Sequence, residues 1–143
     1  MAFSLHILPQ DRLAVVRYGP AITGLDVVHA AEGVLTHEAW EPTYNVAVDW
    51  RDVRHLVLEP EHVTQLRETT RHLRDHLGPG RTAALIRRDA DEVAAAVLLL
   101  RAWRHPDRAR RIFRNVAAAE AWLGLTPGLL RLPTEPMPQE TGP

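Results

Sequence analysis

The chain has 143 residues, of which 45% are apolar and 24% are charged, and its 17 arginines nearly balance 18 acidic residues to give a formal net charge of −1. This composition fits one globular domain and excludes a disordered chain, and it lacks the strongly basic balance of a dedicated nucleic-acid-binding protein. The absence of cysteine excludes disulfides, thiolate metal sites and a cysteine nucleophile. The start of the chain lacks a secretory signal, and the longest apolar run, residues 93–100, is too short to span a membrane, so we expect a cytoplasmic protein.

The first half of the chain predicts a β-hairpin, a helix and a central strand. Apolar residues alternate with polar ones over 3–7, a turn follows at 9–12, and residues 13–18 form a second strand. Thr23 and Asp26 have the spacing of a capping box for a helix over 23–37. Residues 44–50 form a β-rich run in which Val46, Ala47 and Val48 are apolar at consecutive positions, which predicts a strand covered on both faces.

The second half alternates helices and strands. Pro60 begins a helix whose apolar spacing extends to residue 77, and a buried strand is expected over 82–86. Asp89 and Glu92 are spaced as caps of a helix over 90–104, a last strand covers 108–114, and Asn115 caps a helix over 116–123. Residues 126–143 contain five of the eleven prolines, which predicts an extended tail.

The predicted order is β-β-α-β-α-β-α-β-α. Successive strand–helix–strand units require parallel strands, so the fold class is α/β with a mixed, mostly parallel five-stranded sheet packed with helices. Only the first strand is expected to run antiparallel. Residues 1–125 then form one domain, and residues 126–143 form a proline-rich C-terminal tail.

Several segments resemble small bacterial proteins of the SpoIIAA-like (STAS-like) superfamily. They read Glu-Ala-Trp-Glu-Pro at 38–42, Val-Ala-Val-Asp-Trp-Arg-Asp-Val at 46–53, Leu-Glu-Pro-Glu-His-Val at 58–63, Arg-Ile-Phe-Arg-Asn at 111–115 and Glu-Ala-Trp-Leu-Gly at 120–124. The resemblance implies a SpoIIAA-like fold and, as in anti-sigma factor antagonists, docking onto partner proteins under control of serine phosphorylation. No Ser or Thr lies between Asp49 and His62, so this switch is not expected here. Glu59 is interpreted as part of the helix start rather than as a fixed mimic of the phosphate.

The loops that follow the parallel strands are expected to meet along one rim, where open α/β sheets bind ligands. The candidate ligand residues there are Tyr18, Asp49, Trp50, Arg51, Asp52, His55 and Arg88. An enzyme would need Asp49 or Asp52 to orient His55 as a base, with Arg51 or Arg88 holding an anion. Turn hydrogen bonds and ion pairs explain the same residues without catalysis, so no catalytic residue is assigned.

Two further patterns permit a chemical or a structural interpretation. His72 and His76 are four residues apart, a spacing at which two histidines of a helix can bind one metal ion. No third ligand is evident, so a polar helix face is favoured and no metal or cofactor is expected. Six arginines between residues 101 and 114 lie around the last strand. They could bind phosphates, although protection of a sheet edge by charge is the simpler explanation.

Residues 93–100 are apolar around the whole helix, so a second surface must cover them. Cover by the tail through Leu129, Leu130 and Leu132 competes with a protein interface, for which the candidates are Leu98, Leu99, Ala102 and Trp103. The leading hypothesis is a non-catalytic interaction or regulatory module that forms a homodimer or contacts another protein. The first alternative is a carrier or sensor of a small apolar ligand held near Tyr18, Trp50 and Trp103, and the second is an enzyme that uses the 49–55 rim. Nucleic acid is not expected as a partner.

Overall fold

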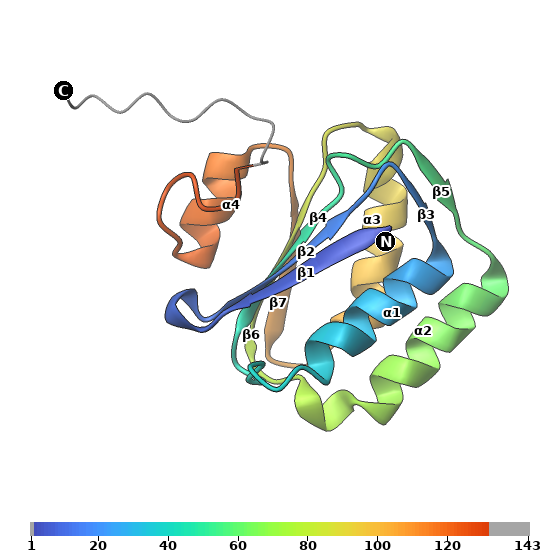
Figure 1. Cartoon of the computed structure of the whole chain (residues 1–143), viewed down its shortest axis with the longest axis horizontal. Helices are drawn as coiled ribbons and strands as arrows, with labels where there is room; N and C mark the ends of the chain where they lie inside the picture. The colour runs from blue at the N-terminus through green and yellow to red at the C-terminus, as the bar shows by residue number, and fades with distance from the viewer. Residues whose placement is uncertain (1, 132–143) are drawn as a thin grey trace.

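A computed structural model describes residues 2–131 and confirms the predicted α/β fold. A five-stranded sheet has the order β1-β2-β4-β6-β7 (Figure 1). Its strands are β1 (Phe3–Leu8), β2 (Leu13–Tyr18), β4 (Asn45–Asp49), β6 (Gly80–Leu85) and β7 (Arg108–Phe113). β1 pairs antiparallel with β2, and the other neighbours pair parallel, as expected.

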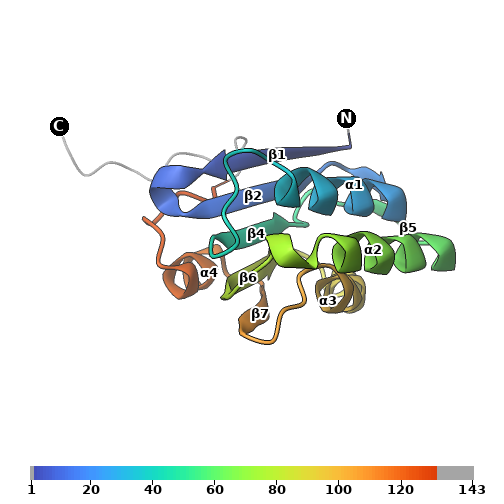
Figure 2. The ribbon, with the colours of Figure 1, turned by 90° about the horizontal axis from the view of Figure 1, so that it is seen from below.

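The helices cover the two faces of the sheet unequally. α1 (Gly24–Leu35), α2 (Pro60–His72) and α3 (Ala90–Ala102) lie on one face, and α4 (Val116–Leu123) lies on the other (Figure 2). No helix within the described part of the chain is long and apolar enough to cross a membrane.

The central strand β4 shows why both faces need cover. Val46, Val48 and the following Trp50 belong to the core beneath α1, α2 and α3, whereas Ala47 belongs to the core beneath α4. All four are buried. Because successive side chains of a strand point to opposite faces, a strand apolar at consecutive positions must lie inside a layered structure.

Local sequence signals fix most helix ends. Thr23 and Asp26 form the predicted capping box of α1, and the Asn115 side chain accepts a hydrogen bond from the Ala118 amide at the start of α4. Asp89 was expected to cap α3, but its side chain makes no capping hydrogen bond and instead pairs with Arg114. That prediction was wrong because a nearby guanidinium attracts the carboxylate away from the helix amides.

The second helix is shorter than its apolar spacing predicts. α2 ends at His72, and a 3₁₀ turn follows over Arg74–His76. The Trp40 indole donates to the carbonyl oxygen of His76 at 2.7 Å, and His76 Nδ1 lies 2.9 Å from the carbonyl oxygen of Leu35. These contacts between distant segments hold the turn in a position that a continued helix would not reach.

The structure also contains a small parallel sheet that the sequence did not predict. β3 (Ala21–Thr23) pairs with β5 (His55–Val57) beside the start of α1. Each strand has three residues, too few for a periodic sequence signal.

The segment after α4 packs on the sheet instead of extending away from it. Residues 126–131 form turns, and Leu130 is fully buried in the core beneath α4, with Leu129 packed against that core. The proposed cover of α3 by this segment is therefore corrected, because Leu129 and Leu130 lie on the opposite face of the sheet. Leu132 lies outside the described residues.

We expect Leu130→Ala to destabilise the protein by about 2–5 kcal/mol, the range for truncating a fully buried leucine. Urea unfolding followed by circular dichroism measures this loss. Leu129→Ala is the matched control, because Leu129 is only partly buried and should cost clearly less. Equal costs for the two variants would contradict the placement of Leu130 in the core.

Candidate functional site

The residues predicted for the ligand rim are divided between the two faces of the sheet. Tyr18 and Trp50 lie on the helix-covered face with an edge-to-face ring contact at 5.1 Å, and both are buried. Burial, with a smaller contribution from the charge of Asp26, raises the pKa of Tyr18 above its ordinary value. Trp103, the third residue expected around an apolar ligand, belongs to the same packed core. These three rings therefore act as core residues in this structure.

Asp49 lies on the opposite face and forms a buried ion pair. The Nε and Nη2 groups of Arg51 donate to its two carboxylate oxygens at 3.0 and 2.9 Å. Arg17 Nε lies 3.5 Å from one of the same oxygens. The side chains of Asp49 and Arg51 are 2% and 5% exposed, so this two-point contact is shielded from water.

The same arginines anchor the segment after α4. Arg51 Nη2 donates to the carbonyl oxygen of Leu130, and Arg17 Nη2 donates to that of Arg131 at 3.0 Å. The Leu130 amide donates to the buried carboxylate of Glu120 at 2.9 Å. Asp49 thus orients a clamp that closes the second face of the sheet, which is a structural role.

The remaining rim residues, Asp52, His55 and Arg88, are not brought into contact with one another. Asp52 and His55 are exposed, and within residues 2–131 their side chains share no hydrogen bond. Arg88 pairs with Asp91 at 3.1 Å at the start of α3. The structure therefore does not join an oriented base to an anion-binding arginine at this rim.

We expect Asp49→Asn to destabilise the protein by about 3–5 kcal/mol, because it leaves Arg51 charged and buried without its carboxylate. Chemical denaturation measures the change. Asp52→Asn removes an exposed carboxylate three residues away and should change stability by less than about 0.5 kcal/mol. A similar small effect for Asp49→Asn would show that the clamp contributes little.

Arg108 is a buried residue whose role the sequence did not reveal. Its guanidinium donates to the carbonyl oxygens of Gly78, Pro42 and Tyr44 at 2.8–3.0 Å and to the Thr82 hydroxyl at 3.1 Å. Burial lowers its pKa to about 10. The sequence favours protection of the sheet edge by the arginines around this strand, but Arg108 instead satisfies carbonyl groups of two loops, which is visible only in three dimensions.

The residues expected at a protein interface are buried within the chain itself. Leu98, Leu99, Ala102 and Trp103 are at most 7% exposed and pack against the sheet and α2. The expectation that these four side chains form an exposed contact surface is corrected, because they point toward the interior rather than outward.

A different side of α3 faces outward. Val93 is 73% exposed, more than Val57 at 53% or Leu25 at 36%, and Ala94, Ala96 and Val97 are partly exposed. We call these four residues the outer face of α3. Beside it, Ala96, Leu99, Arg110, Arg111 and Ile112 line a groove of about 340 Å³ against edge strand β7. At the first turn of the helix, Arg114 pairs with Asp89 and with Glu92, so the apolar face has a charged border.

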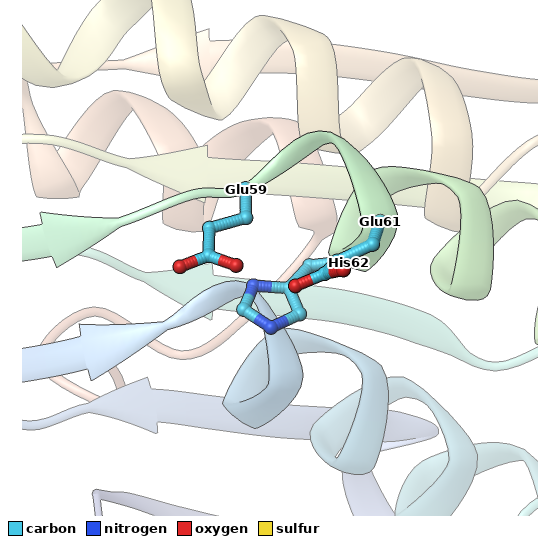
Figure 3. A group of neighbouring side chains, drawn as sticks. All are labelled: Glu59, Glu61 and His62. Atoms are coloured by element: carbon cyan, nitrogen blue, oxygen red, sulfur yellow. The ribbon is translucent and has the colours of Figure 1, made fainter.

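A cluster of two carboxylates and a histidine marks the start of α2 (Figure 3). Glu59, Glu61 and His62 each place one potential metal-ligand atom within 4.8 Å of those of the other two residues. The hydrogen bond between the two carboxyl groups, together with the negative charge of Glu59, raises the pKa of Glu61. The positive end of the helix dipole stabilises the carboxylates of Glu59 and Glu61 at this position.

His72 and His76, for which a polar helix face is favoured over a metal site, have different surroundings. His72 lines a hollow formed by α1 and α2, whereas His76 lines a separate hollow with Trp40 and Pro42. The contact of His76 Nδ1 with the Leu35 carbonyl oxygen gives this residue a structural role.

Comparison with solved structures shows a SpoIIAA-like fold. An uncharacterised protein of the DUF3478 family from Shewanella loihica PV-4, described as having a SpoIIAA-like fold, aligns with a TM-score of 0.53 and 15% identity over 85% of this chain and 92% of the other. The anti-sigma factor antagonist SpoIIAA in its unphosphorylated form aligns with a TM-score of 0.50 and 12% identity over 86% of this chain and 98% of the other. No protein-family model and no curated protein sequence matches this chain. The fold predicted from the resemblance is confirmed.

Proposed function

We propose that this chain is a non-catalytic interaction module that self-associates through the outer face of α3. The observation that carries the proposal is the exposure of Val93 beside Ala94, Ala96 and Val97 on one helix. Contact surfaces of this kind are contiguous and apolar, and they are bordered by polar groups. The ion pairs of Arg114 provide such a border at one end.

The partner that we propose for this face is a second copy of the chain. In a two-fold dimer the same face meets itself, so Val93 of each copy can pack on the small side chains Ala94 and Ala96 of the other. Small residues allow two helices to approach to about 8–10 Å. The neighbouring groove against β7 provides further apolar area through Ala96 and Ile112.

The likeness to SpoIIAA supports an interaction role but not its phosphorylation switch. That protein is an anti-sigma factor antagonist, which acts on another protein. In this chain no Ser or Thr occurs between Asp49 and His62, and α2 begins instead at Glu59 and Pro60. Regulation by contact would therefore depend on association itself rather than on a phosphate at this helix start.

We expect Val93→Asp to weaken self-association roughly a hundredfold or more, because it places two carboxylates in an apolar contact. Light scattering over a series of protein concentrations measures the dimer dissociation constant. Val57→Asp is the matched control, since Val57 is also an exposed valine but lies in β5, away from α3.

Loss of the dimer in Val93→Asp with retention in Val57→Asp supports the proposed interface. A monomeric wild-type chain at high concentration contradicts self-association. An unchanged dimer in Val93→Asp places the interface elsewhere.

A further inference from the structure

Five arginines gather around one cleft between the C-terminal ends of α2 and α3. Leu35, Thr70, Leu77 and Ala102 also line this cleft, whose volume is about 370 Å³. The arginines are Arg67, Arg71, Arg74, Arg101 and Arg104. Three come from α2 and the turn after it, and two come from the end of α3 and the residues after it, so only the packing of the two helices brings them together.

These arginines carry an uncompensated positive charge. All five are exposed, and across residues 2–131 none of their guanidinium groups has an ion pair or a hydrogen bond. The nearest acidic residues of α2 and its following turn, Glu68 and Asp75, line other hollows instead. Four arginines elsewhere in the fold, Arg17, Arg51, Arg88 and Arg114, are each paired with a carboxylate.

Helix ends account for part of this charge but not for all of it. Arg71 and Arg101 lie in the last turns of α2 and α3, where a cation is favourable. The Thr70 hydroxyl lies 2.9 Å from the carbonyl oxygen of Arg101, which joins the two helices and partly satisfies the end of α3. About half an elementary charge at each helix end leaves most of the five positive charges unbalanced.

We infer that this cleft binds a compact anion that carries two or more phosphate groups. The guanidinium group contacts phosphate oxygens at two points, and several guanidinium groups around one hollow match several phosphates. The volume lies within the range of small-molecule sites. A nucleic acid would be expected to need an extended basic surface with stacking aromatic rings, whereas this cleft is compact and its floor is formed by the apolar residues Leu35, Leu77 and Ala102.

Isothermal titration calorimetry with inorganic triphosphate at low ionic strength tests the inference. We expect saturable binding of one triphosphate per chain that weakens as salt is added, since screening reduces attraction between exposed charges. The double variant Arg71→Gln/Arg101→Gln removes one guanidinium from each helix. It should weaken binding roughly a hundredfold, about tenfold for each lost charge-assisted contact.

Arg54→Gln/Arg87→Gln is the matched control, because it removes the same net charge from two exposed arginines that form no ion pair among the described residues and do not line the cleft. Thermal unfolding without ligand checks that each variant folds.

Retained binding in the control together with loss in the cleft variant supports the site. Absence of saturable binding to the wild-type chain, or equal losses in both double variants, overturns it. Val93→Asp should bind triphosphate as the wild type does, so this test is independent of the proposed dimer.

Discussion

The burial of β4 on both faces is the constraint on which the rest of the structure depends. Val46 and Val48 need cover from one side and Ala47 from the other, so neither layer of helices can be omitted. Three helices fill one face, while α4 and the turns after it close the second. The turns after α4 have the least regular structure of this second layer. The clamp from Asp49 through Arg51 to the carbonyl oxygen of Leu130 holds them on the sheet.

This layering also separates residues that are neighbours in sequence. Asp49 and Trp50 follow one another, yet their side chains lie on opposite faces of the sheet, because side chains alternate across a strand. Asp49 is engaged by Arg51 and Arg17 on its side of the sheet, whereas Tyr18 and Trp50 pack on the other side. Buried charge therefore serves the fold here, in Asp49 and Arg51 as in Arg108.

Two surfaces that other molecules could contact lie on α3 and beside it. The early turns of α3 expose an apolar face, and its last turn contributes to a basic cleft with α2. The proposed dimer contact would use the first of these surfaces, and the proposed polyanion site would use the second. The SpoIIAA-like fold does not by itself determine either role.

The sequence by itself determined the order of the main elements, the mixed parallel sheet and most helix ends. These features follow from local periodicity and capping, as at Thr23 and Asn115, which act within a few residues. Only the tertiary structure decided which side of α3 faces outward, where Leu130 packs and which arginines share a cleft. A helix that is apolar all round carries no signal for its buried side, and charges far apart in sequence become neighbours only when their helices pack.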